Sequence, residues 1–350
     1  MYTESYFEDI KKIIELNTKI RELKNHSLLI TGANGLICSA LIDFLIYLNE
    51  FENASILIYA AGRNEEKMKK RFGEYFSREY FHFVQYDANK NFIFDKNVNY
   101  IIHGASNAHP SAYDREPVET MMSNFYGTYN LLTYIKKMPA TRFLLISSSE
   151  VYGENTERAL LKEDNFGYSD ILNYRSCYPS SKRAAETLCA SFKKEYNIDF
   201  TIVRPGHIYG PMATNEDTRA SAQFINKALN KESIIMKSAG MQLRSYCHAF
   251  DCASSIFYTL LFGKSGEAYN ISNKNSIVTI REFAEMLSLC SKQKIIFQDP
   301  SLAEKKSYNM MSFSALASDK IENLGWVGGY DLKAGIQQTL NTMNRGILRE

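Results

Sequence analysis

Apolar stretches of strand length alternate with longer segments of helical period from residue 27 onward, and this alternation constrains the fold more than any other feature. Strands that are separated by helices must be joined by crossovers, so the order predicts an α/β fold with a doubly wound, mostly parallel sheet. In such a sheet, ligands bind at the carboxyl ends of the strands. The expected strands cover residues 27–32, 55–61, 81–87, 99–105, 142–148 and 199–205.

Composition excludes several classes of partner. The formal charge is +2 and the only short basic run covers residues 67–71, so nucleic acid is not an expected partner. The apolar runs fall far short of the ~20 residues that span a bilayer, so we expect no membrane helix. The six cysteines show no metal-ligand spacing, which predicts free thiols, no metal site and a reducing cytoplasm.

The stretch "TGANGLIC" directly follows the first expected strand and opens a helix. Gly32 and Gly35 are placed so that backbone N–H groups and the helix N-terminus can face a pyrophosphate, which predicts a dinucleotide cofactor. The alternative is an ordinary tight turn, because a glycine pair alone is a weak signal. Cys38 occupies the third small position of the usual fingerprint. The residues expected to line the cofactor here are Gly32, Asn34, Gly35, Leu36 and Ile37.

The ends of the next three strands carry further candidate cofactor contacts. The acidic residue that would bind a ribose 2′-hydroxyl is missing, and Arg63 stands in its place. Arg63 could pair with the 2′-phosphate of NADP, or it could be an exposed arginine at a helix start. Asp87, followed by Ala88, is a candidate partner for the adenine amino group. After the fourth strand, the cofactor is expected to lie over Gly104, Ala105 and Ser106.

Tyr178 and Lys182 lie four residues apart in "CYPSSK", which places them on the same face of the helix that this segment opens. A phenol with a pKa near ~10 is a poor base at neutral pH unless a nearby cation stabilises its anion. The segments "ISSSEVYG" and "RPGHIYGP" each follow a strand. All three segments are therefore expected at the same rim of the sheet.

With these motifs in order, the sequence resembles the extended short-chain dehydrogenases/reductases, in particular the NAD-dependent epimerase/dehydratase family that acts on nucleotide sugars. The resemblance covers about residues 27–330 and rests on "TGANGLI", "YIIHGAS", "NFYGTYNLL", "SSSEVYG", "YPSSK", "RPGHIYGP", "RSYCHAFDCA" and "GEAYNIS". It implies a Rossmann-type sheet, tightly bound NAD, a nucleotide-sugar substrate and a homodimer. It also implies an isomerase or lyase of polysaccharide biosynthesis.

The resemblance and the change of character after Pro211 together predict the domain organisation. Residues 1–26 are expected to form an amphipathic helical extension, and residues 27–210 the dinucleotide-binding domain with the catalytic residues. Residues 211–350 are expected to form mostly a smaller lobe that binds the nucleotide sugar. A strand at 266–273 is expected to return to the main sheet.

Roles in catalysis are carried over from the family to matching positions. The resemblance makes Tyr178 the base that removes a proton from a sugar hydroxyl while hydride leaves carbon 4. Lys182 would hold the phenolate and the nicotinamide ribose, and Ser148 would orient the hydroxyl. Asn124 and Pro205 are expected beside the cofactor, with Asn124 supporting the site from behind.

Glu150 distinguishes this chain from simple 4-epimerases, which usually carry a neutral residue there. Decarboxylases of the family carry "SE" before "VYG" and 4,6-dehydratases carry "DE"; this chain has Ser149 and Glu150. A carboxylate here can remove the carbon-5 proton or assist loss of a carboxylate β to the ketone. Decarboxylation or dehydration therefore leads, with 4-epimerisation, net 4-dehydrogenation and non-catalytic dinucleotide sensing as alternatives.

The substrate contacts come from the same resemblance. Arg244 and Arg219 match arginines that meet the diphosphate, for which a fork of donors is suited. The alternative is a pair of surface arginines. The other expected substrate contacts are Ser149, His109, Tyr113 and His207.

Overall fold

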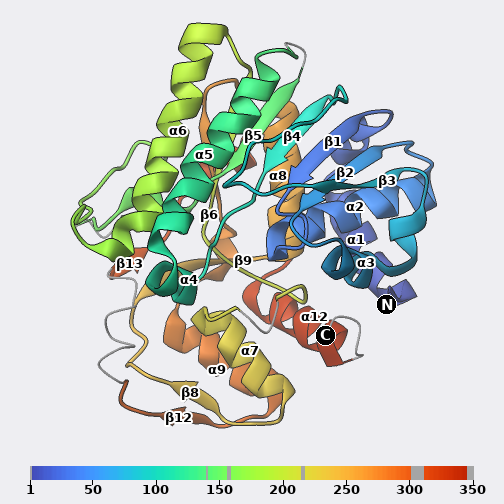
Figure 1. Ribbon diagram of the computed structural model, residues 1–350. Helices are drawn as coiled ribbons and strands as arrows, with labels where there is room; N and C mark the ends of the chain where they lie inside the picture. Colours follow the sequence, from blue (N-terminus) through green and yellow to red (C-terminus); the bar gives the residue numbers. More distant parts are fainter. Residues whose placement is uncertain (1, 139–140, 156–158, 214–216, 301–310, 345–350) are drawn as a thin grey trace.

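The computed structural model describes residues 2–138, 141–155, 159–213, 217–300 and 311–344. Its centre is a seven-stranded sheet in the order β10-β6-β5-β4-β1-β2-β3, in which every neighbouring pair is parallel. The predicted doubly wound fold is confirmed, including the late strand that joins the sheet beside β6 (Figure 1). The strands are β1 (Ser27–Thr31), β2 (Leu57–Gly62), β3 (Phe81–Gln85), β4 (Tyr100–His103), β5 (Arg142–Ile146), β6 (Phe200–Pro205) and β10 (Ala268–Ile271).

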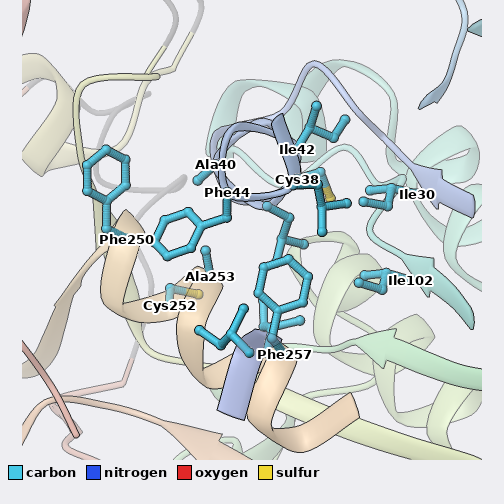
Figure 2. Packing of buried hydrophobic residues seen from close by; sticks show 14 of the residues in the cluster. Ile30, Cys38, Ala40, Ile42, Phe44, Ile102, Phe250, Cys252, Ala253 and Phe257 are labelled. Atoms are coloured by element: carbon cyan, nitrogen blue, oxygen red, sulfur yellow. The ribbon is translucent and has the colours of Figure 1, made fainter. Parts of the chain in front are cut away.

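Helices cover both faces of this sheet. On one face, α2 (Leu36–Glu52) packs against α8 (Ala249–Phe262), and Figure 2 shows the side chains of the two helices facing one another. The rings of Phe44 and Phe250 meet edge to face, with centroids 5.6 Å apart. On the other face, α5 (Pro117–Ile135) packs along α6 (Cys177–Tyr196). The sheet is therefore buried on both sides, as its almost continuous apolar strands require.

The predicted N-terminal helix is present as α1 (Glu4–Leu16), followed by a 3₁₀ turn, η1 (Thr18–Leu23). Its buried face joins the same core as α2 and α8. The hydroxyl of Tyr6 donates to the carboxylate of Asp43 in α2 at 2.5 Å, and Arg71 pairs with that carboxylate at 2.5 Å. This buried cluster fixes α1 to α2 beside the main sheet.

Two boundaries differ from the sequence prediction for local reasons. Strand β2 begins at Leu57 rather than at residue 55, because Ser55 has a left-handed φ of 54°. Both backbone groups of Ile56 also bond the side-chain amide of Asn49, which takes that residue out of the strand ladder. In addition, the chain rejoins the main core earlier than expected. Helix α8 already packs in that core, and it precedes the strand expected at 266–273.

Most of the remaining C-terminal elements share a hydrophobic cluster of their own below the sheet in Figure 1, whereas the short helix Asp319–Glu322 packs against α8 and β10 of the main body. A small sheet joins β11, β9 and β13, with β7 paired to β9, and β12 pairs with β8. The division at residues 210 and 211 stays a prediction. The elements of this region are β7 (His207–Tyr209), α7 (Ala220–Leu229), β8 (Ile234–Met236), β9 (Leu243–His248), η5 (Lys274–Ser276), β11 (Ile277–Thr279), α9 (Ile280–Ser291), β12 (Ile295–Phe297), β13 (Phe313–Ser314), α11 (Asp319–Glu322) and α12 (Leu332–Asn344).

Short elements connect the strand ends and supply several residues of the site. They are α3 (Glu65–Phe72), η2 (Gly73–Ser77), α4 (Pro110–Arg115), η3 (Ser149–Tyr152) and η4 (Tyr174–Ser176).

Candidate functional site

A cavity of about 1160 Å³ opens at the carboxyl ends of the strands and extends toward α7, β8 and β9. The predicted site residues, with one exception, lie in its wall although they come from segments far apart in the sequence. Those that line it are Gly32, Asn34, Gly35, Leu36, Ile37, Arg63, Asp87, Ala88, Gly104, Ala105, Ser106, His109, Tyr113, Ser148, Ser149, Glu150, Tyr178, Lys182, Pro205, His207, Arg219 and Arg244.

The exception is Asn124. It is buried in α5, and its side-chain amide donates to the hydroxyl of Ser181 in α6 at 2.9 Å and to the Thr120 carbonyl at 3.1 Å. Asn124 therefore does not line the cavity, and its contact with a cofactor stays a prediction. Its position joins the two helices behind the site, because Ser181 adjoins Lys182.

The glycine-rich loop brings two strand ends into close approach. Gly32 has a φ of +73°, and a Cβ there would lie 2.8 Å from the Ala105 nitrogen, so a larger residue would be strained twice over. Gly35 caps α2, whose first N–H groups face the cavity. Cys38 packs directly beneath Gly104, where a side chain would collide with its sulfur.

Polar atoms in this part of the wall are suited to a bound dinucleotide. The buried Asn34 Oδ1 and the hydroxyls of Ser106 and Ser147 have no hydrogen-bond partner among the described residues. Buried polar atoms normally have partners, so these three call for a polar ligand. Together with the close approach at Gly32, they fit the cofactor that the sequence predicts.

The far end of this cavity is basic and lacks the expected carboxylate at the end of β2. The strand ends at Gly62, and the cavity wall continues with Arg63, Asn64 and Lys67. Asp87 lies across from them after β3 and accepts the backbone N–H of Asn89 at 3.0 Å. The sequence prediction named Arg63 but overlooked Lys67, which lies in the first turns of α3 and lines the same cavity.

Tyr178, at the start of α6, is buried with its ring in the cavity wall. Burial raises the pKa of its phenol to about 12, and the negative charge of Glu150 acts in the same direction. A hydrogen bond with Ser148 and the positive charges of Arg219 and Arg175 lower the pKa. The phenol is thus surrounded by the groups that can change its protonation state.

Lys182 lies one helical turn further along α6 and is also buried. Its ammonium donates to the Ile146 carbonyl at 2.8 Å and lies 5.9 Å from the centre of the Tyr178 ring. Burial lowers the pKa of Lys182 to about 8. Contrary to expectation, the lysine does not bring the pKa of Tyr178 below its ordinary value; its ammonium is directed at the end of β5.

Glu150 has a partner that the sequence analysis missed. Its two carboxylate oxygens each meet one terminal nitrogen of Arg175 at 3.1 Å. The guanidinium of Arg175 also lies 4.5 Å above the ring of Tyr113, and that ring stacks on Tyr178 with centroids 4.8 Å apart. The available signal was position: Arg175 stands three residues before Tyr178 in "RSCYPSSK".

The opposite wall holds two arginines with different partners. Arg219 pairs with Asp217 at 2.5 Å. Arg244 is buried and donates to the carbonyls of Leu243 and Met311, at 2.9 and 2.7 Å, so the surface-arginine alternative is wrong for this residue. Burial lowers the pKa of Arg244, which is the expected result for a cation that has no carboxylate bonded to it among the described residues.

The two predicted histidines differ in surroundings. Burial and the nearby arginines hold the pKa of His207 well below its usual range, so the ring is neutral. Its Nδ1 is buried without a partner among the described residues. His109 precedes α4 and its Nδ1 lies 2.9 Å from the Ser111 hydroxyl.

Two general features of the described chain bear on its partners. In the described ranges, no group of three or more His, Cys, Asp or Glu residues could hold a metal ion. Within the same ranges, no helix is both long enough and apolar enough to cross a membrane.

Comparison with known proteins places this site in a family. The sequence pattern described as "NAD dependent epimerase/dehydratase family" matches residues 28–272. The chain belongs to this family. The resemblance of the glycine loop and of the Tyr178 and Lys182 motif is thereby confirmed at the level of the family.

Two relatives and one solved structure show which members of the family this chain is similar to. UDP-glucuronic acid decarboxylase 3 of Arabidopsis thaliana is 33% identical over 261 residues, which cover 75% of this chain and 73% of the relative. UDP-glucuronic acid decarboxylase 6 of the same plant is 30% identical over 312 residues, covering 89% and 87%. The structure of UDP-glucuronic acid 4-epimerase from Bacillus cereus, with UDP-glucuronic acid and NAD, has a TM-score of 0.76 at 20% identity and covers 91% of this chain and 99% of that one. The structural likeness shows the shared fold.

Proposed function

We propose that this member of the epimerase/dehydratase family is a nucleotide-uronic-acid decarboxylase that uses bound NAD. The observation that carries the proposal is the position of Glu150: its carboxylate lies in the cavity wall beside Tyr178 and Ser148. Two relatives that are at least 30% identical to this chain are UDP-glucuronic acid decarboxylases, which supports the same reaction. A nucleoside-diphosphate hexuronic acid is the corresponding substrate.

The first step is oxidation of the sugar at carbon 4. Tyr178 takes the proton of the 4-hydroxyl, and Ser148 holds that hydroxyl in line. A bound NAD would supply the acceptor for the carbon-4 hydride and the donor that returns it after the second step. Lys182 supplies a positive charge 5.9 Å from the centre of the Tyr178 ring. The side chains of Asn34, Ser106 and Ser147, which have unpartnered polar atoms among the described residues, are available to hold the cofactor.

The second step uses the new ketone. A carboxylate at carbon 6 is β to a ketone at carbon 4, so its carbon–carbon bond breaks with the electron pair passing to the ketone oxygen. Carbon dioxide leaves and carbon 5 takes up a proton. Glu150 lies where it can assist this proton movement. Ser149 occupies the position at which a dehydratase carries an acid, which favours decarboxylation over loss of water.

A 4-epimerase is the second candidate. Both oxygens of Glu150 are bonded by Arg175, so Tyr178 is the proton acceptor that is not held in an ion pair. The fold shared with a UDP-glucuronic acid 4-epimerase is compatible with this reading. Net dehydrogenation and dinucleotide sensing have no comparable support.

The adenosine end of the cavity bears on the cofactor. Arg63 and Lys67 supply two cations where a carboxylate would select NAD, so NADP is the alternative cofactor. Binding of NAD and of NADP to the purified protein can be compared by fluorescence titration. If NADP is preferred, Arg63→Asp should weaken NADP binding and spare NAD, whereas Arg115→Asp, at a surface ion pair, should change neither. Unchanged NADP binding by the Arg63 variant would contradict a role of Arg63 in that preference.

We also propose a homodimer formed through α5. Its exposed side includes Val118, Met121, Met122, Phe125 and Tyr129, which repeat at helical spacing. A second copy that presents the same side would bury this apolar stripe.

We propose that the protein is located in the cytoplasm, since all six cysteines are free thiols.

The test is product analysis after incubation with UDP-glucuronic acid, UDP-glucose and dTDP-glucose in the presence of NAD or NADP. Loss of carbon dioxide from UDP-glucuronic acid is expected. A new isomer of unchanged mass would identify the epimerase, and loss of water from a neutral hexose would identify a dehydratase. No change with any of these sugars would contradict the proposal.

A further inference from the structure

We infer that Arg175 is a positioning residue for the reaction: it holds the Glu150 carboxylate in place and shields the Tyr178 phenolate from the charge of that carboxylate. The inference rests on the proposed function, because it assigns a part in the same two steps. Its basis is the geometry of four side chains that come from three separate segments of the chain.

The first observation is the two-point ion pair. Each terminal nitrogen of the guanidinium meets one oxygen of Glu150 at 3.1 Å, and the two side chains are only 11% and 20% exposed. A planar fork that binds both oxygens fixes the plane of the carboxylate as well as its distance. The pair is partly desolvated, so salt and water weaken it less than they weaken a surface ion pair.

The backbone at both ends of this pair is fixed independently. The hydroxyl of Ser148 accepts the N–H of Glu150 at 3.2 Å. The side chain of Asn173 accepts the N–H of Arg175 at 3.0 Å, at the turn that leads into α6. Both residues are therefore held by their own segments, and their ion pair connects the loop after β5 to the helix of Tyr178.

The second observation is that the arginine reaches the phenol through an aromatic ring. The guanidinium lies over the Tyr113 ring at 4.5 Å, and Tyr113 stacks on Tyr178 at an interplanar angle of 19°. A cation over one face of the stack is favourable and restricts both rings. Arg175 thus restrains Glu150 directly and Tyr178 through Tyr113.

The electrostatic effect follows from the charges around the phenol. Glu150 in η3 raises the pKa of Tyr178, while Arg175 in η4, Arg219 before α7 and the Ser148 hydrogen bond lower it. Tyr113 in α4 stacks against the ring as a neutral group, because burial raises the pKa of its phenol well above the usual value. Lys182 on α6 lies beyond the ring.

One further charge acts on the ion pair, because Arg244 in β9 interacts electrostatically with Glu150. Cys177 adds no charge at neutral pH, since burial raises the pKa of its thiol. Neither Arg244 nor Arg219 is bonded to Glu150 among the described contacts. When Arg175 is removed, the carboxylate therefore loses its bonded cation while it remains beside Tyr178.

The test separates the two steps in a single-turnover experiment with UDP-glucuronic acid, measuring cofactor reduction by absorbance and carbon dioxide release by mass. Arg175→Met should slow cofactor reduction by about tenfold or more at neutral pH, since each pKa unit added to Tyr178 removes about nine tenths of its phenolate. The rising limb of the pH profile for reduction should move to higher pH. Arg175→Lys, which keeps the charge, should restore reduction but not the full rate of carbon dioxide release.

The decisive variant combines Arg175→Met with Glu150→Gln. If Arg175 acts by offsetting the charge of Glu150, the double variant should reduce cofactor faster than Arg175→Met alone, although carbon dioxide release stays lost. Reduction in the double variant that is equal to or slower than in the single variant would overturn the inference. The control is Arg115→Met, which removes an arginine from a surface pair with Glu116 and should change neither step.

Thermal unfolding of each variant guards against a trivial loss of fold, and a variant that does not fold is replaced by Arg175→Gln in the same comparison. The wild type distinguishes the two proposals. If the wild type reduces no cofactor with any sugar, the proposed function fails and the inference fails with it. If the wild type reacts and Arg175→Met reduces cofactor at the wild-type rate and pH, the inference alone is wrong.

Discussion

The hydroxyl of Tyr178 is the group on which the proposed first step depends, because it lies buried at the cavity wall with a hydrogen bond to Ser148. Tyr178→Phe removes that one oxygen and leaves the stacked ring in place. We expect turnover to fall by about a hundredfold or more, the usual contribution of a positioned acid or base. Tyr196→Phe, on the exposed end of the same helix, should retain full activity. More than about a tenth of the wild-type rate in the Tyr178 variant would contradict the assignment.

The titration of Lys182 predicts how activity varies with pH. Since burial lowers its pKa to about 8, the ammonium is lost as pH rises through that value. A step that needs this cation should therefore slow above about pH 8, as a falling limb in kcat/KM. Lys182→Arg keeps a cation throughout the range, so the activity that remains should lack this limb. A limb at the same pH in the arginine variant would assign it to another group.

The sequence predicted most residues of the cavity wall because each stands in or next to a recognisable motif. Glu150 follows the end of β5 and Tyr178 opens α6, and both lie in the cavity wall. The pairing of Arg175 could not be predicted, because its partner lies 25 positions away and the pairing depends on how two loops meet. The hydrogen bond from Asn124 to Ser181 was equally out of reach, because it depends on how α5 packs on α6.

At the scale of elements, α1 is fixed to the fold by a buried charge. The hydroxyl of Tyr6 and the guanidinium of Arg71 share the carboxylate of Asp43, so removing one donor leaves that charge less satisfied. We expect Tyr6→Phe to lower the free energy of unfolding by about 1.5–3 kcal/mol, the range for hydrogen bonds to charged groups. Chemical denaturation measures this.

The matched control for Tyr6→Phe is Tyr126→Phe, because the Tyr126 hydroxyl bonds Asn91 at an exposed position. That variant should stay within about 0.5 kcal/mol of the wild type. Equal effects of the two substitutions would show that the buried cluster does not stabilise the N-terminal helix.

Helices and strands were predicted well where the hydrophobic periodicity alone determines them. They were predicted less well where their bounds or positions depend on contacts with distant residues. All six early strands exist, since each is a short apolar run bounded by polar residues. The start of β2 was missed because Asn49 in the preceding helix binds both backbone groups of Ile56. The return of α8 to the main core was also missed, because its apolar residues fit either lobe until α2 is in place.

At the scale of the whole molecule, the exposed stripe on α5 predicts self-association. Phe125→Asp places a charge in its middle and should convert the proposed dimer to a monomer, measured by sedimentation at micromolar concentration. Leu289→Asp, at another exposed apolar position on α9, should leave the dimer intact. A wild-type protein that sediments as a monomer would contradict the proposal.

In the whole molecule, Tyr178 and Lys182 beside the main sheet and Arg219 and Arg244 from the C-terminal part line one cavity. The central claim of the proposed function is that oxidation at carbon 4 is followed by a separate step that needs Glu150. The most direct test is a single turnover of Glu150→Gln with UDP-glucuronic acid. The account predicts that reduced cofactor accumulates while carbon dioxide release is lost. Release of carbon dioxide at the wild-type rate would contradict it.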